Sequence, residues 1–220
     1  MNFLQLVQRL RMEAGVSGTG PVSVVAQTGE MAELVTWIQA AYQDIQNLRP
    51  NWRFMQDEFT FPMIAGVKAY LPSAVSLDDL AIWLPDDVRV YLSAGDEAAI
   101  TYEPWADFRA IRDMGTIPTG RPTHFSIKPN NALVFWPTPD DDYTCRGEYI
   151  CVPDELSGNT DTPIIPAQYH MLIVWRALTS YGAALAAEEK YNHGLQEYRR
   201  LMKAMESTQL PSEAMWEPLV

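Results

Sequence analysis

Cysteine, histidine and long apolar runs are scarce in this chain, and each scarcity excludes a class of protein. The 220 residues include two cysteines and three histidines, with no CxxC pair and no spacing typical of metal ligands. No apolar run approaches the roughly 20 residues that a membrane helix needs. The first residues also lack the basic start and apolar core of a signal peptide. We therefore expect a globular protein that folds by burying a core.

Both cysteines, Cys145 and Cys151, fall in one predicted strand. At about 3.3 Å per residue, their Cα atoms would lie roughly 20 Å apart. A disulfide requires a Cα separation below about 7 Å. We therefore predict two free thiols, which suits folding in a reducing cytoplasm.

Basic residues are also in the minority. The chain has 16 Lys and Arg residues against 28 Asp and Glu residues, a net charge of −12. Nucleic-acid-binding proteins usually show a basic patch. The nearest candidate is Arg199, Arg200 and Lys203, and it lies in a segment that is also rich in glutamate. We interpret it as a solvated helix face.

Catalytic signatures are missing as well. The sequence has no GxSxG, HExxH, Walker or dinucleotide-binding glycine pattern. His124, His170 and His193 are isolated from one another, which favours packed or capping side chains. Carboxylate pairs such as Asp86-Asp87 are neighbours in predicted turns rather than groups that face each other across a cleft. We therefore predict no enzyme, no catalytic residue, no bound metal and no cofactor.

One acidic cluster stands out, at Asp140, Asp141 and Asp142. A calcium loop needs oxygen ligands at alternating positions and a bidentate acid downstream. Glu148 is available, but the glycine-punctuated spacing of such a loop is missing. Aspartate also suits an exposed hairpin turn. Two interpretations stay open: a turn that presents a surface, or a binding module that grips carbohydrate or Ca²⁺ through this loop.

Helical periodicity marks both ends of the chain. One apolar stripe runs from Met31 to Leu48 and predicts an amphipathic helix, capped by Thr28 and ended by Pro50. A shorter helix begins near Phe3 and stops at Gly15. A long helical region from about Ala167 to Ser207 carries two further stripes. Residues 192–194, Asn-His-Gly, are predicted to bend or split it.

The middle of the chain has the period of strands. From Trp52 onward, short apolar runs alternate with turns every 8–12 residues, which predicts a sandwich or barrel. Residues 79–83 and 88–92 read as two strands around a turn at Pro85-Asp86-Asp87. Residues 104–114 read as a short helix. Residues 120–153 read as three consecutive strands, a meander.

These patterns predict an α+β fold. N- and C-terminal helices form a bundle, with an antiparallel β-sandwich or meander domain inserted between them and an extended C-terminal tail. The expected boundaries are 1–50 for the first helices, 51–153 for the β domain, 154–207 for the last helices and 208–220 for the tail.

The tail holds an isolated tryptophan. Five others fall in apolar or periodic contexts and are predicted to pack in the core: Trp52, Trp83, Trp105, Trp136 and Trp175. Met215 and Trp216 instead lie in a segment without periodicity. They are either anchors for a partner protein or part of a disordered terminus.

Several short motifs occur in a characteristic order. They are "AAYQDIQNLRPNWRFM", then "GRPTHFSIKPNNALVFWPTPDDDYTCRGEYICVPDEL", then "PIIPAQYHMLIVWRALTSYGAAL", then "YRRLMKAM". Each is loosely specific, but their order resembles that of head-to-tail adaptor (connector) proteins of tailed bacteriophages over nearly the whole chain.

The resemblance implies a structural virion protein that is made in the host cytoplasm. It would form a ring of about twelve copies under the portal protein, extend the DNA channel and offer an attachment surface to a tail or nozzle protein. Double-stranded DNA would pass without specific binding, and no membrane would be involved. By position, Leu210, Met215, Trp216 and Leu219 would dock into the portal. The loop at Asp140–Asp142 would face the tail or the next subunit.

Overall fold

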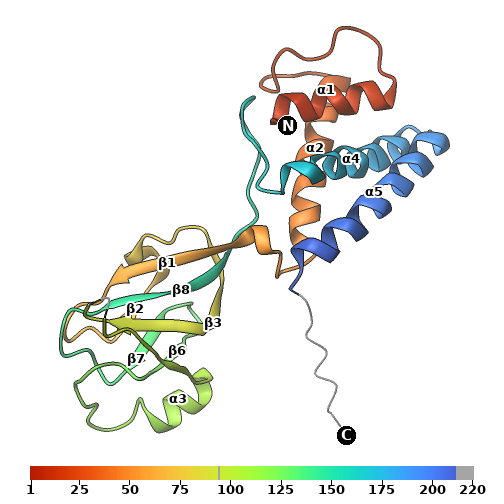
Figure 1. The fold of residues 1–220 in the computed structure, drawn as a ribbon. Coiled ribbons are helices and arrows are strands. Elements are labelled where there is room, and N and C mark those ends of the chain that lie inside the picture. Colours follow the sequence, from red (N-terminus) through yellow and green to blue (C-terminus); the bar gives the residue numbers. More distant parts are fainter. Residues whose placement is uncertain (94, 212–220) are drawn as a thin grey trace, which may run out of the picture. The chain divides into compact units, whose positions relative to one another are not determined.

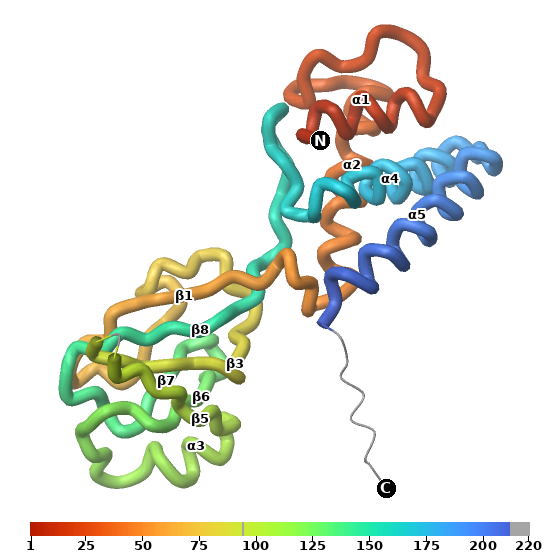
Figure 2. The backbone as a smooth tube through the Cα atoms, in the orientation of Figure 1, coloured from red at the N-terminus to blue at the C-terminus, as the bar shows by residue number. Residues whose placement is uncertain are grey.

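The computed structural model describes residues 1–93 and 95–211 and confirms the α+β class. The chain forms two compact units. The helical unit combines Met1–Met55 with the chain from Pro153 onward, and the β unit is Gln56–Val152. Figures 1 and 2 show the chain leaving the helices once, through β1, and returning once, through β8.

Four helices build the helical unit, and α4 lies at its centre. They are α1 (Phe3–Ala14), α2 (Glu30–Asn47), α4 (His170–Ala184) and α5 (Glu188–Gln209), with short 3₁₀ turns at Arg53–Met55 and Ala167–Tyr169. Helix α4 packs against each of the other three. It is therefore apolar over most of its circumference, as expected of a helix surrounded by others.

The helix starts and stops follow local chemistry, with one correction. Helix α1 begins with a capping box between Asn2 and Gln5. It ends at Gly15 (φ 79°), as predicted. Helix α2 starts after Gly29, and no side chain caps it. The predicted cap at Thr28 is therefore wrong. The chain enters α2 through the positive φ of Gly29 (59°), which leaves Thr28 one residue too early.

The break in the C-terminal helical region lies earlier than predicted. Helix α4 ends at Ala184 and α5 begins at Glu188, with Ala186 at φ 51° between them. Gly194, the predicted breaker, lies inside α5. A Cβ atom there would come within 3.1 Å of the Trp175 carbonyl oxygen and 3.2 Å of the Thr179 nitrogen. The glycine therefore permits close packing of α5 on α4.

The segment from Pro153 to Pro166 is tied to the helices rather than freely exposed. Leu156 and Ile165 are buried. The carbonyl oxygens of Asn159 and Asp161 accept hydrogen bonds from the backbone N–H groups of Leu4 and Phe3 (3.2 and 2.8 Å). These are donors that the first turn of α1 cannot satisfy within the helix. This segment is therefore an ordered part of the helical unit.

His170, the first residue of α4, is buried, and we expect it to make stability depend on pH. Its Nε2 lies 2.9 Å from the Ile165 carbonyl oxygen and its Nδ1 lies 2.6 Å from the Met1 amino group. Burial and then the neighbouring amino charge lower the pKa of His170 below its usual 6.5. Below pH 6.5 the unfolded chain therefore binds the proton more readily than the folded chain, and stability falls with pH.

The measurement is urea unfolding between pH 7.5 and 5. The stability that neutral His170 provides should be fully present above pH 6.5 and lost as pH falls toward the folded-state pKa. In His170→Gln the amide can still donate to Ile165 and accept from the amine, but it does not titrate. We expect a flatter pH profile for this variant. An unchanged profile would show that other groups cause the dependence.

Two four-stranded sheets form the β unit, in the orders β1-β8-β3-β4 and β2-β7-β6-β5. Aromatic side chains from both sheets fill the core between them, including Phe59, Trp83, Phe125 and Phe135. The elements are β1 (Gln56–Pro62), β2 (Ala69–Tyr70), a 3₁₀ turn (Pro72–Val75), β3 (Leu80–Tyr91), β4 (Ala98–Ala99), β5 (Thr101–Tyr102), α3 (Trp105–Ile111), β6 (His124–Ile127), β7 (Leu133–Trp136) and β8 (Thr144–Cys151).

The connectivity corrects the predicted meander. Strands β6 and β7 form the expected antiparallel hairpin, but β8 crosses to the other sheet and pairs with β1 and β3. The second sheet is mixed, because β5 pairs with β6 in parallel. Cys145 and Cys151 both lie in β8 and are free thiols, as predicted.

Strand β3 also differs from its prediction. Residues 79–83 and 88–92 do not form a hairpin. They belong to one strand whose pairing with β8 shifts between Leu84 and Arg89. The segment Pro85-Asp86-Asp87 is thus a bulge within the strand, a position that tolerates proline in a sheet. Two further short strands, β4 and β5, follow β3 and belong to different sheets.

Candidate interaction surface

Three loops lie side by side at the end of the β unit where β1 stops and β8 starts (Figure 1). They are residues 63–68, 112–120 and 137–143, and we call them together the loop end. They are joined by backbone bonds from Gly66 N to Pro139 O (2.8 Å) and from Gly120 N to Thr138 O (2.9 Å). The ion pair of Lys68 Nζ with Asp113 Oδ1 (2.7 Å) adds a third link. The three loops of the loop end are therefore held together by hydrogen bonds and an ion pair.

The predicted acidic residues hold this structure in shape. Asp142 Oδ1 accepts a hydrogen bond from Ala65 N (2.9 Å), and Asp141 Oδ1 accepts one from Asp142 N (2.8 Å). Asp140 Oδ1 accepts one from the Tyr143 hydroxyl (2.8 Å). Burial, and then the bond to Asp140, raises the pKa of Tyr143 to about 12. Each carboxylate thus accepts a bond within the loop end.

The same geometry bears on the calcium interpretation. The three aspartates are exposed, and their carboxylates bond to three different partners. Within residues 1–93 and 95–211, no group of three or more His, Cys, Asp or Glu side chains could hold a metal ion. The carboxylates of Asp140, Asp141 and Asp142 therefore do not converge on a common site.

Sequence analysis missed the apolar side chains that accompany the aspartates. Ile64 is 58% exposed and Met114 is 68% exposed, and Val67 is also exposed. Exposed apolar side chains that gather on one surface can mark a site for a partner protein. The missing signal was spatial, because these residues come from two loops that are about 50 residues apart in sequence.

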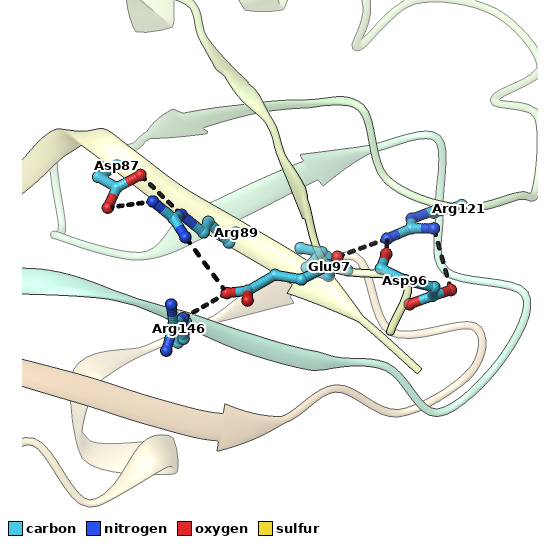
Figure 3. Close-up of polar contacts among 7 residues, drawn as sticks. Asp87, Arg89, Asp96, Glu97, Arg121 and Arg146 are labelled. Atoms are coloured by element: carbon cyan, nitrogen blue, oxygen red, sulfur yellow. Dashed lines mark hydrogen bonds and ion pairs between the residues drawn. The ribbon is translucent and has the colours of Figure 1, made fainter. Parts of the chain in front are cut away.

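A network of ion pairs lies on the outer side of the first sheet (Figure 3). Arg89 bonds both carboxylate oxygens of Asp87 (2.8 and 3.0 Å). Glu97 lies 2.5 Å from Arg146 and 3.8 Å from Arg89. The network connects β3, β8 and the chain before β4. It is partly exposed, so we interpret it as a structural link of modest strength.

Arg121, in the Gly-Arg-Pro lead-in to β6, fixes the same loop from its other side. Its guanidinium donates to the Val90 carbonyl oxygen (2.6 Å), to Asp96 Oδ2 (3.1 Å) and to the Asp96 carbonyl oxygen. The planar fork of arginine suits three acceptors at once. Figure 3 shows it on the far side of Asp96 from Glu97.

We expect Arg121→Ala to destabilise the β unit by about 1–3 kcal/mol, because two carbonyl oxygens lose a charged donor. Arg121→Lys should recover only part of the loss. The measurement is the urea midpoint followed by tryptophan fluorescence. Arg109→Ala, at an exposed arginine of α3, is the matched control and should change little. Equal urea midpoints for Arg121→Ala and Arg109→Ala would show that the hydrogen bonds of Arg121 do not stabilise the β unit.

The predicted portal-docking residues lie almost entirely outside the described part of the chain. Leu210 is half-buried, and its N–H closes the last turn of α5 on the Glu206 carbonyl oxygen (3.1 Å). Met215, Trp216 and Leu219 lie outside the described residues. Their role stays a prediction.

Comparison with known proteins adds one match. A family model described as SU10 adaptor protein matches residues 1–215. None of the curated proteins matches the chain. In the described part of the chain, no helix is both long and apolar enough to cross a membrane.

Proposed function

Because the chain belongs to the SU10 adaptor protein family, a family of bacteriophage structural adaptors, we propose that it acts at the head-to-tail junction of the virion. There it forms a ring under the portal, extends the DNA channel and provides the tail attachment surface. The observation that carries the proposal is the family match over residues 1–215, nearly the whole chain. A structural role of this kind needs no catalytic group.

The loop end is the surface that we assign to contacts with the next subunit or the tail. Its three loops are bonded to one another, so a partner would not have to order them on binding. Pre-ordering of this kind lowers the cost of association. Asp140, Asp141 and Asp142 give the surface its charge, and Ile64 and Met114 give it apolar area.

The C-terminal segment is the part that we assign to the portal. It follows directly on α5, and Leu210, Met215, Trp216 and Leu219 are its large apolar residues. Tryptophan and methionine are enriched where proteins bind one another. A short segment with such anchors suits insertion into a groove on the portal.

The charge distribution suits a channel wall. The β unit, residues 56–152, holds 15 acidic and 7 basic residues, so it carries −8 of the net −12. Non-specific DNA binding depends on cations that displace phosphate counterions. A ring of about twelve such copies would let double-stranded DNA pass without holding it.

The proposal is tested by mixing the purified chain with the portal ring encoded in the same genome and separating the mixture on a density gradient. We expect the chain to move into the portal fractions at a constant copy ratio. Separate migration at micromolar concentrations and moderate salt would contradict the proposal.

A further inference from the structure

The helical unit carries a surface that is complementary to the loop end. Arg199 and Lys203 lie one turn apart on α5, both are exposed, and neither forms an ion pair with a described residue. Arg49 pairs with Glu206 in the last turns of the same helix (3.2 Å), so the chain after α2 lies beside this end of α5. Leu48 is 48% exposed there. We call Leu48, Arg49, Arg199 and Lys203 the basic end.

The loop end has the opposite character. Asp140, Asp141 and Asp142 are exposed and form no ion pair with the residues that the structure describes. Their hydrogen-bond partners are backbone N–H groups and a neutral hydroxyl, which leave the negative charge uncompensated. Ile64 and Met114 add apolar area beside them.

We propose that the loop end of one copy docks on the basic end of a second copy. This inference rests on the proposed ring and specifies its interface. The two surfaces differ and lie on different units of the chain, so each copy offers one of each. Contacts between unlike surfaces build a ring when the rotation from copy to copy closes. Pairing a surface with its own copy would instead place aspartates against aspartates.

Charge attraction and apolar contact would both favour docking of the loop end on the basic end. The three uncompensated carboxylates attract Arg199 and Lys203, which form no ion pair with a described residue, and this attraction speeds association and selects the partner. The apolar side chains Ile64, Met114 and Leu48 supply the contact that excludes water. The interface should weaken as salt rises, because exposed charges are screened beyond about 10 Å at 0.1 M salt.

The test uses two variants, each blocked at one surface. The first is Ile64→Glu with Asp141→Lys, chosen because the one hydrogen bond of the Asp141 side chain to a described residue comes from the next backbone N–H in its loop. The second is Arg199→Glu with Lys203→Glu. Asp107→Lys and Arg109→Glu, both exposed positions of α3, are controls for the change in charge. Circular dichroism checks that every variant is folded.

The readouts are the number of copies on each portal ring, by mass, and the species formed in solution. We call the ring of copies bound to one portal ring the collar. We expect wild type and both controls to form complete collars. Each blocked variant should place at least tenfold fewer copies on a portal ring. Mixed together, the two blocked variants should form a one-to-one pair through their remaining intact surfaces. Neither variant should form pairs when alone.

The other outcomes separate the interface from the adaptor function. Full collars from both blocked variants would overturn the interface and leave the adaptor function standing. Pair formation without any wild-type collar would overturn the adaptor function alone. Neither collar nor pairs would overturn both. The Arg199→Glu with Lys203→Glu variant could instead form normal collars but bind duplex DNA more weakly than wild type. That result would assign the basic end to DNA contact and would overturn the proposed interface.

Discussion

Truncation after Pro211 is expected to abolish binding of the chain to the portal ring and to leave the helical unit folded. The last turn of α5 closes at Leu210, whose N–H bonds to Glu206, so the cut removes no described helical contact. Met215 and Trp216 are the proposed anchors. Loss of one buried aromatic anchor typically costs 2 kcal/mol or more, about 30-fold in affinity.

The measurement is the affinity of the truncated chain for immobilised portal rings. Trp216→Ala should reproduce most of the loss, and Glu217→Gln is the matched control in the same segment. Circular dichroism should give the same thermal unfolding midpoint for full and truncated chains. Undiminished portal binding by the truncated chain would show that another surface docks.

Gly182→Ala is expected to be the most damaging single methyl addition in the helical unit. A Cβ at Gly182 would lie 2.5 Å from the backbone nitrogen of Tyr191 and 2.8 Å from its Cα. Backbone atoms cannot relieve this clash by changing rotamer, as a side chain can. Helices α4 and α5 must therefore move apart. Overpacking of this kind costs about 1–3 kcal/mol, occasionally more, and exceeds the gain of up to about 1 kcal/mol from replacing a helical glycine.

The check is chemical unfolding followed at 222 nm, where the helices dominate. Gly95→Ala adds the same methyl at a position with nothing within 4 Å of the added atom, so it should change stability little. We also expect Gly182→Ala to weaken collar formation, because α5 carries the basic end and leads to the C-terminal segment. Equal stability of the two variants would contradict the close packing of α4 on α5.

Elements that depend on local periodicity could be predicted from the sequence. The apolar stripe from Met31 to Leu48 predicted α2, and the short apolar runs from Trp52 onward predicted the strands of a sandwich. The positive φ of Gly15 ends α1 as expected. In each case the residues that decide the structure are neighbours in sequence, so hydrophobic period and turn chemistry suffice.

Features that depend on distant contacts were missed. Nothing in the pattern of Thr144–Cys151 reveals that β8 joins β1 and β3 rather than β7, because pairing partners are chosen by the whole sandwich. Residues 192–194 were predicted to bend or split the C-terminal helical region. Gly194 instead lies within α5 and allows it to pack closely on α4. A glycine within a helical pattern can either break the helix or allow close packing of a second helix. Only the tertiary contacts distinguish these two roles.

The candidate site shows the same division. Asp140–Asp142 could be identified as an exposed turn because aspartate suits turns. Their association with Ile64 and Met114 could not be identified, since the loops that carry them lie far apart in sequence and meet only in the folded unit. Arg199 and Lys203 of the basic end were interpreted, together with Arg200, as a solvated helix face. Its proposed role depends on the link between Arg49 and α5.

Electron microscopy of the full chain mixed with its portal ring tests the central claim most directly. The adaptor account predicts a collar of added density on one face of the portal, with rotational symmetry and a fixed number of copies, that disappears when residues 212–220 are deleted. Bare portal rings beside free chains, at micromolar protein and moderate salt, would contradict it.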